Sequence, residues 1–221
     1  MTFKNLDRIV FIGDSVTDAG SVNPIGEGSN NLGTGYVRVI DNMLTAYYPE
    51  LTLKIYNSGI NGHTSRSLKN RFDTDVLALK PDYISICVGI NDAYQFFDSR
   101  FLPDKVVTLT EYESNLTEMI EKSIKAAKKV FIMSPFYMEP FKDDQIRSLM
   151  DKYNGVCKNL SEKYGCVFID LQEMFDAFFK FRHPTAIAGD RVHPNPIGAT
   201  LIAREFLKHC GFDTEHVPEK L

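Results

Sequence analysis

The stretch Arg8-Ile9-Val10-Phe11-Ile12-Gly13-Asp14-Ser15 decides the fold expected for this chain. Its unbroken apolar run is typical of a parallel strand that is covered by helices on both faces. Gly13 then permits a tight exit from the strand, which places Ser15 directly beyond the strand end. Because ligands bind at the carboxyl ends of strands in parallel sheets, we expect the Ser15 hydroxyl to face a cleft.

Four further apolar runs of similar length follow along the chain. They are Leu53–Asn57, Tyr83–Val88, Val130–Ser134 and Cys166–Asp170. Between and after these runs, apolar residues recur with the period of a helix, within Tyr36–Tyr48, Leu116–Ala127, Ile146–Tyr164, Leu171–Phe179 and Ile197–Cys210. Strands that alternate with helices predict parallel β-α-β units. The sequence therefore predicts an α/β fold in one domain over residues 1–221, with a five-stranded parallel sheet between two helix layers.

The composition excludes several classes of function. A hydrophobic content of 43% and a charged content of 24% are ordinary for a soluble globular protein. A net charge of −4 without a Lys/Arg-rich block argues against binding to nucleic acid or to anionic membranes. Residues 1–7 hold no apolar leader segment, no apolar run reaches the roughly 18 residues of a membrane span, and the four cysteines form no C-x-x-C pair. We expect a cytoplasmic protein.

Three successive strand ends carry groups that suit acyl transfer. Ser15 supplies a hydroxyl after the first strand, and Gly59-Ile60-Asn61-Gly62 exposes backbone N–H groups after the second. Gly89-Ile90-Asn91-Asp92 supplies a carboxamide after the third. Each feature alone also fits a plain structural role: a helix N-cap, a glycine-rich turn capped by Thr64 or Ser65, or an Asx-turn. Their coincidence at one edge of the sheet favours a catalytic site.

Asp190 and His193 precede the last helix and lie three residues apart. This spacing lets the carboxylate orient the imidazole, and a serine hydroxyl needs such an oriented base to become a nucleophile. The alternative is that Asp190 only pairs with Arg191. Four other histidines compete for the role of base. They are His63, beside the proposed amide donors, and His183, His209 and His216.

These features together resemble a known family. Four blocks, Gly13-Asp14-Ser15, Gly62, Gly89-x-Asn91-Asp92 and Asp190-x-x-His193, are similar in kind and order to those of the SGNH (GDSL-type) hydrolases. The resemblance implies a three-layer α/β/α sandwich of flavodoxin-like outline, without a metal or other cofactor. It implies Ser15 as nucleophile, His193 as general base and Asp190 as its orienting acid. It also implies an oxyanion hole made by the backbone N–H groups of Ser15 and Gly62 and the side-chain amide of Asn91.

Nearly the whole chain is similar to one subgroup, the intracellular acetylxylan esterases of Gram-positive xylan-utilising bacteria. The stretches that carry this similarity are Phe11–Asp18, Gly26–Gly28, Leu32–Val37, Tyr48–Leu51, Lys80–Asp82, Pro135–Tyr137 and Asp190–Pro194. The similarity implies removal of O-acetyl groups from xylose units in short, imported xylo-oligosaccharides. In that subgroup aromatic residues help subunits to pack into rings, and this chain has His183, Gly189 and Thr214 where such residues are expected. We therefore expect a smaller homo-oligomer, a dimer.

Substrate contacts are expected from side chains near the predicted catalytic groups, namely Asp14, His63, Asp92 and Tyr94. Tyr94 also belongs to an aromatic cluster that forms either an apolar pocket wall or a core or subunit contact. The members of this cluster are Tyr94, Phe96, Phe97 and Phe101.

Three other functions remain open at this point. A broad short-chain acyl esterase or thioesterase would use the same catalytic set. A flavodoxin-like protein could bind an anion or a nucleotide at its strand ends, although neither a P-loop nor a G-x-G-x-x-G motif is present. A zinc hydrolase would need a third ligand beside Asp190 and His193.

Overall fold

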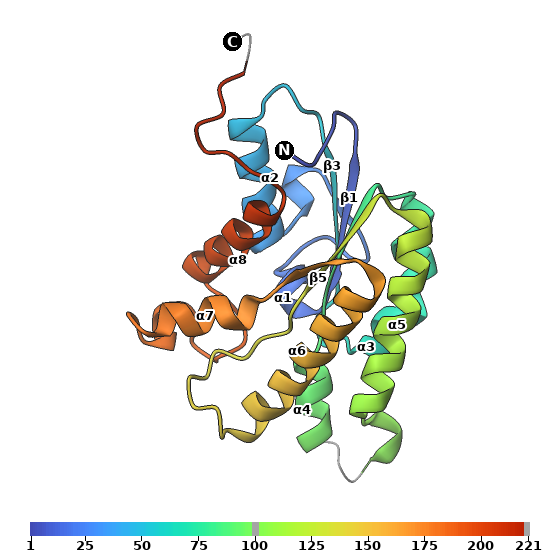
Figure 1. The fold of residues 1–221 in the computed structure, drawn as a ribbon, viewed down its shortest axis with the longest axis vertical. Helices are drawn as coiled ribbons and strands as arrows, with labels where there is room; N and C mark the ends of the chain where they lie inside the picture. Colours follow the sequence, from blue (N-terminus) through green and yellow to red (C-terminus); the bar gives the residue numbers. More distant parts are fainter. Residues whose placement is uncertain (99–101, 219–221) are drawn as a thin grey trace.

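The computed structural model describes residues 1–98 and 102–218 as one sheet between two layers of helices (Figure 1). The five predicted parallel strands are confirmed, and their order in the sheet is β3-β1-β4-β5-β6. Their bounds are Arg8–Gly13 for β1, Lys54–Gly59 for β3, Tyr83–Cys87 for β4, Lys129–Met133 for β5 and Val167–Ile169 for β6.

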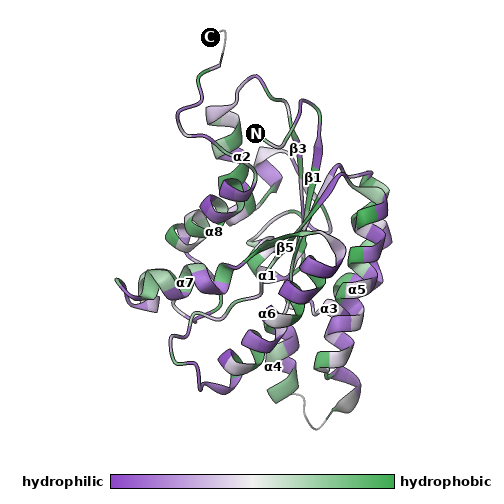
Figure 2. Ribbon diagram, viewed as in Figure 1, coloured by the Kyte–Doolittle hydropathy of each residue, from purple (hydrophilic) through white to green (hydrophobic). Residues whose placement is uncertain are grey.

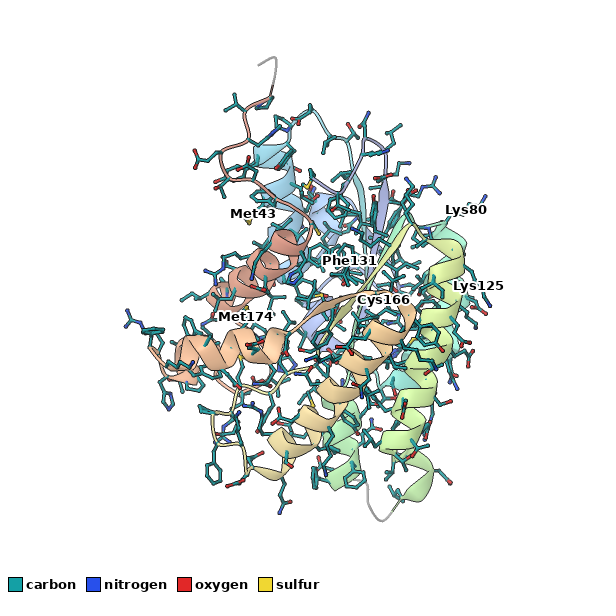
Figure 3. The ribbon with its side chains drawn as sticks, in the orientation of Figure 1. Met43, Lys80, Lys125, Phe131, Cys166 and Met174 are labelled. Carbon is teal, nitrogen blue, oxygen red and sulfur yellow. The ribbon has the colours of Figure 1, made fainter. Side chains whose placement is uncertain are left out.

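The central strands are apolar because helices cover both faces of the sheet. Residues 9–12 of β1 have no exposed surface, and neither has Phe131 of β5. Figure 3 shows Phe131 at the centre of the molecule, whereas Lys80 and Lys125 lie at its outer surface. This pattern explains why the strands can be found in the sequence as continuous apolar runs.

The sheet contains a sixth strand, which the sequence analysis missed. β2 (Gly26–Glu27) pairs antiparallel with β3 at the edge of the sheet, Gly26 opposite Asn57 and Glu27 opposite Tyr56. The prediction of five strands is therefore one too few. A two-residue edge strand is defined by its backbone pairing and buries no apolar run, so it leaves no hydrophobic signal in the sequence.

The helices form the two outer layers. In Figure 1, α2, α7 and α8 lie on one side of the sheet and α3, α5 and α6 on the other. Figure 2 shows hydrophilic residues on the outer faces of these helices.

The α-helices are α1 (Ser15–Asp18), α2 (Tyr36–Tyr47), α3 (Ser65–Asp75), α4 (Ile90–Asp98), α5 (Leu109–Ala126), α6 (Gln145–Tyr164), α7 (Leu171–Phe179) and α8 (Pro196–His209). The 3₁₀ helices are Ser29–Asn31, Leu77–Leu79, Pro103–Lys105 and Pro184–Ala186. Within residues 1–98 and 102–218, none of the helices combines the length and the hydropathy that a membrane crossing requires.

The strand order determines where a ligand can bind. From β1 the chain moves outward to β3, and it then crosses back to continue on the other side of β1 with β4. The loops after β1 and β4 therefore run in opposite directions, which opens a crevice at the carboxyl ends of these two strands. Ser15 follows β1 and Asn91 follows β4, so both residues border this crevice.

Candidate active site

Ser15 is the first residue of α1 and lies directly after β1. Asp14 caps the helix, since its Oδ1 accepts a hydrogen bond of 3.0 Å from the backbone N–H of Val16. The preceding residue must be glycine, because a Cβ atom on Gly13 would lie 2.1 Å from Oγ1 of Thr17 and 2.6 Å from the carbonyl oxygen of Cys87. The sharp turn that results presents a half-buried serine hydroxyl at the strand end.

A hydrogen-bonded relay connects three of the predicted residues. Nε2 of His193 lies 2.9 Å from Oγ of Ser15, and Nδ1 of His193 lies 2.5 Å from Oδ2 of Asp190. Serine hydrolases use this geometry, in which the imidazole takes the hydroxyl proton while a carboxylate holds the other ring nitrogen. The arrangement can therefore generate a serine nucleophile.

Asp190 is held in its ionised form. Partial burial disfavours the charge, but the His193 ring and the backbone N–H groups of His193 and Val192 donate hydrogen bonds to the carboxylate. These bonds outweigh the burial and lower the pKa of Asp190 to about 2. The carboxylate consequently orients His193 throughout the neutral pH range.

The segment that carries this pair, residues 187–195, is tied to the rest of the fold at several points. Its ends meet where the N–H of Asn195 donates to the carbonyl of Ile187 over 2.8 Å. Arg191 adopts a left-handed conformation, with φ of 66°, and its carbonyl accepts a bond from the N–H of Met138. Its guanidinium also pairs with Glu139 at 2.8 Å. The 138–139 segment thus fixes the backbone between Asp190 and His193, a role the sequence analysis did not find.

The loop after β3 lies beside the strand end that carries Ser15. The N–H of Ile60 donates to the carbonyl of Gly13 over 3.1 Å, and Gly62 follows with φ of +77°. A Cβ atom on Gly62 would meet nothing within 4 Å, so this part of the loop borders open space. Asn91 joins the same loop, because its side-chain Nδ2 donates to the carbonyl of His63 over 3.0 Å. The predicted amide donors of Gly62 and Asn91 are therefore neighbours.

Two of the predicted substrate contacts need correction. Asp14 and Asp92 have exposed fractions of 2% and 0%, so neither carboxylate is open to a substrate. Asp14 caps α1, whereas Asp92 accepts hydrogen bonds from the backbone N–H and the hydroxyl of Ser65. Burial raises the pKa of Asp14 to about 6 and that of Asp92 to about 7. Asp14 therefore stabilises the first turn of α1, and Asp92 stabilises the first turn of α3.

The other two predicted contacts, His63 and Tyr94, are partly exposed. Nδ1 of His63 accepts a hydrogen bond of 3.1 Å from Nε of Arg71, a residue the sequence analysis did not single out. Tyr94 packs edge-to-face against Tyr137. Burial raises the pKa of Tyr94, and Tyr137 and the negative charge of Asp190 raise it further.

The rest of the aromatic cluster lies further along α4. Phe96 and Phe97 pack edge-to-face with ring centroids 5.3 Å apart, and Phe96 is 40% exposed. Phe101 lies outside the described residues. Neither Phe96 nor Phe97 borders the cavity that adjoins Ser15.

That cavity has a volume of about 200 Å³ and lies against Ser15 and His193. Apart from Ser15 and His193, its lining is mostly apolar, and Thr34 and Tyr36 add two hydroxyl groups. The lining residues are Ser15, Val16, Ala19, Thr34, Gly35, Tyr36, His193, Pro194, Ala199 and Ile202. Pockets for drug-sized ligands measure about 300–1,000 Å³, so this cavity suits a short acyl group or one small ring.

The remaining histidines do not join the relay. Nδ1 of His209 lies 2.9 Å from the carbonyl oxygen of Glu205 in the last turn of α8, and His183 caps the 3₁₀ helix Pro184–Ala186. His216 contacts Glu50. Among residues 1–98 and 102–218, no cluster of three or more His, Cys, Asp or Glu side chains is arranged to hold a metal ion. The zinc-hydrolase alternative therefore lacks a third ligand in the described part of the chain.

Fold and site together define a serine hydrolase of the α/β class. Comparison with known families agrees with this result, because residues 11–201 match the GDSL-like lipase/acylhydrolase family. The chain belongs to this family and is a carboxylic-ester hydrolase.

Two known proteins match this chain over almost its full length. The acetylxylan esterase of Geobacillus stearothermophilus is 43% identical over 208 residues, which cover 94% of this chain and 95% of the relative. A crystal structure of that enzyme superposes with a TM-score of 0.94, at 41% identity and full coverage of both chains. An alpha/beta hydrolase enzyme from the metagenome of Lake Arreo, Spain, matches with a TM-score of 0.91, 37% identity and coverage of 96% and 98%.

The solved variants of the Geobacillus enzyme include three that are described as catalytic mutants, with a serine, an aspartate or a histidine replaced by alanine. Two other variants replace a tryptophan by isoleucine. This chain contains no tryptophan, so it differs from that enzyme at both tryptophan positions.

Proposed function

We propose that this protein removes O-acetyl groups from acetylated xylo-oligosaccharides through an acyl-enzyme on Ser15. The observation that carries the proposal is the relay from Asp190 through His193 to Ser15, with distances of 2.5 and 2.9 Å. The sugar substrate is supported by the full-length similarity to a bacterial acetylxylan esterase.

The chemistry follows from the positions of the side chains. Oγ of Ser15 attacks the acetyl carbonyl carbon while its proton passes to Nε2 of His193. The bond between the carbonyl carbon and the sugar oxygen then breaks, and His193 returns the proton to that oxygen. In the second half, His193 takes a proton from water, the resulting hydroxide attacks the acyl-enzyme, and acetate leaves as Ser15 regains its proton.

The negative oxygen of each tetrahedral intermediate needs preorganised donors. In this proposal they are the backbone N–H groups of Ser15 and Gly62 and the side-chain amide of Asn91. The amide of Asn91 has two N–H groups, and its bond to the carbonyl of His63 leaves one of them free for the oxyanion. Ser15 begins α1, and a residue at this position has no partner for its N–H within the helix.

A second candidate, a broad short-chain acyl esterase or thioesterase, is favoured by the lining of the cavity. Val16, Ala19, Ala199 and Ile202 offer apolar contact to an acyl group and no hydrogen bond to a sugar hydroxyl.

One experiment separates the two candidates. Rates are measured for acetylated xylobiose and for 4-nitrophenyl esters from acetate to octanoate, with Ser15→Ala as the blank. The sugar-acetyl function predicts the highest kcat/KM on the acetylated disaccharide and a steep fall beyond the acetate ester. Equal rates up to the hexanoate ester, with slow release of acetate from the sugar, would instead support the broad esterase.

We further propose a cytoplasmic, homodimeric protein. All four cysteines are free thiols, as is usual in a reducing compartment. Phe141 and Phe181, which are 63% and 85% exposed, offer apolar surface of the kind that subunit contacts cover. Sedimentation velocity at micromolar concentration tests the dimer, and a sharp monomer peak would contradict it.

A further inference from the structure

The side chain of Arg71, on α3, forms more hydrogen bonds beside the active site than the side chain of Ser15, Asp190 or His193. Its side chain is 11% exposed, and all five of its N–H groups donate hydrogen bonds. The acceptors are the carbonyl of Gly13, the carbonyl and hydroxyl of Ser58, the carboxylate of Asp75 and Nδ1 of His63.

These acceptors belong to the segments that present the catalytic groups. Gly13 ends β1 two residues before Ser15, Ser58 lies at the end of β3, and His63 follows Gly62. The bonds measure 3.2 Å to Gly13, 2.7 Å to the carbonyl of Ser58 and 3.1 Å to His63. One rigid, planar guanidinium therefore sets the position of the Gly62 loop relative to the nucleophile strand.

The contact with His63 also fixes a proton. A guanidinium N–H can only donate, so Nδ1 of His63 must accept and carries no proton. The neutral ring then has its proton on Nε2, and within the described residues this nitrogen makes no hydrogen bond. On its other side, His63 is held through its carbonyl by the amide of Asn91.

We propose that Arg71 is a positioning residue for the oxyanion hole. It holds the loop that contains Gly62 in a fixed position relative to Ser15, and it keeps His63 in the neutral form that carries its proton on Nε2. This inference rests on the proposed roles of Gly62 and Asn91. It assigns His63 the part of a fixed hydrogen-bond donor at the edge of the site and excludes it as a second base.

The charges around His63 agree with a neutral ring. Partial burial lowers the pKa of His63 and the Arg71 charge lowers it further, while Asp75 on the same helix opposes them weakly. Asp18 of α1 is the other carboxylate bound to this loop, and its Oδ2 accepts from the N–H of Asn61 over 3.2 Å. Removal of the Arg71 charge should therefore raise the pKa of His63.

Arg66 provides a matched control on the same helix. It also donates four hydrogen bonds, but its acceptors are Glu111 and the carbonyls of Asp104 and Val106, away from the Ser15 loop. Arg66→Met therefore removes a comparable network without touching the site. Arg71→Lys keeps the charge but cannot reach all five acceptors from one ammonium group.

The test has two independent readouts. Long-range ¹H–¹⁵N spectra of the wild-type protein show which ring nitrogen of His63 carries the proton, and pH titrations compare His63 in wild type, Arg71→Met, Arg71→Lys and Arg66→Met. Steady-state kinetics with 4-nitrophenyl acetate give kcat and KM for the same proteins. The spectra do not depend on activity, so they test the inference even if the proposed substrate or hole is wrong.

We expect an Nε2 proton in the wild type and a higher His63 titration midpoint in Arg71→Met. We also expect a fall in kcat of about 10- to 100-fold in Arg71→Met at nearly constant KM, because the donors act only in the transition state. Arg71→Lys should lose a similar part of kcat while its His63 midpoint stays near that of the wild type. Arg66→Met should match the wild type in both readouts.

Three results would each overturn the proposal: a proton on Nδ1 of His63 in the wild type, an unchanged His63 titration midpoint in Arg71→Met, or a kcat of Arg71→Met equal to that of Arg66→Met. If Arg71→Met fails to fold, the wild-type spectrum and the kinetics of Arg71→Lys decide.

Discussion

Nε2 of His193 lies 2.9 Å from Oγ of Ser15, although the two residues are 178 positions apart in the sequence. The nucleophile follows the first strand and the base precedes the last helix, so the contact forms only when the whole sheet is assembled. Ester hydrolysis is therefore also a sensitive measure of the native fold.

Replacement of Ser15 by alanine should abolish hydrolysis of 4-nitrophenyl acetate and leave the fold intact. The loss should exceed about 10⁴-fold in kcat, because an enzyme without the nucleophile of its triad can still bind the ester but cannot form the acyl-enzyme. His193→Ala should behave alike. Circular dichroism must show unchanged melting, and residual activity within about tenfold of the wild type would rule out the assigned nucleophile.

The orientation of His193 by Asp190 predicts a large effect of an almost isosteric change. Asp190→Asn replaces a carboxylate that accepts from Nδ1 by an amide that can donate to it, which favours the wrong tautomer of His193. We expect a loss of about 10⁴-fold in kcat near pH 7. Because the pKa of Asp190 is about 2, its own protonation should not contribute to any loss of wild-type activity above about pH 4. Steady-state kinetics from pH 4 to pH 9 check both points.

Asn91→Ala should lower kcat by about 10²–10³-fold with little change in KM, since its amide is proposed to bind the oxyanion only. Asn154→Ala is a suitable control, because Asn154 of α6 donates to Asp170, the N-cap of α7, and makes no contact with Ser15. A large rise in KM at constant kcat would show instead that Asn91 binds the ground state of the substrate.

The buried carboxyl of Asp92 predicts a specific pH dependence of stability. Its pKa is about 7 in the folded protein and about 3.9 in an unfolded chain. Between these values the folded state keeps a proton that the unfolded state has released. This contribution to stability is therefore full below about pH 4 and declines as the pH rises toward 7, by at most about 1.4 kcal/mol per pH unit.

Asp92→Asn cannot ionise, so this part of the pH dependence should disappear. Urea unfolding at pH 5 and pH 8 gives the free energy of unfolding for both proteins, and the difference between the two pH values should be smaller in the variant. Asp73→Asn, a change of an exposed carboxylate, should leave the difference unaltered. Equal differences for wild type and Asp92→Asn would show that Asp92 titrates normally.

Gly59, the last residue of β3, and Gly62, in the loop that follows, should respond differently to alanine. A Cβ atom on Gly59 would lie 2.1 Å from the backbone nitrogen of Asp18 in α1, so Gly59→Ala should cost about 3 kcal/mol or more and displace the helix that carries Ser15. Gly62 borders open space, so Gly62→Ala should cost only about 1–2 kcal/mol for its positive φ and retain its N–H. Denaturant unfolding combined with 4-nitrophenyl acetate assays compares the pair. Greater damage from Gly62→Ala would contradict the described packing.

Much of the fold can be predicted from the sequence because the sheet is covered on both faces. Buried strands such as β1 and β4 are short apolar runs, and long helices such as α6 repeat apolar residues every three or four positions. β2 could not be found, since a two-residue edge strand buries almost nothing. α4 was also missed, because Gly89-x-Asn91-Asp92 fits a turn as well as the first turn of a helix.

The residues of the active site also fall into two groups, those that can be predicted from the sequence and those that cannot. Ser15, Asp190 and His193 can be proposed from sequence because they occur in short motifs at predictable strand and helix ends. Asp92 was placed wrongly, since successive residues of a helix point about 100° apart, so the neighbour of Asn91 turns into the core. Arg71 could not be found at all, because its acceptors lie in three separate segments and only the folded chain brings them together.

The loop of residues 187–195 closes on itself through the bond from Asn195 to Ile187, and it holds both Asp190 and His193. Acid and base therefore belong to one loop, whereas the nucleophile belongs to the helix that follows β1. A change at an exposed position of this loop therefore leaves the spacing between Asp190 and His193 intact, as long as the backbone bonds at Ile187 and Arg191 are kept. Gly189 is such a position, because a Cβ atom there would meet nothing within 4 Å, so protein engineers can introduce side chains next to Asp190 without rebuilding the catalytic pair.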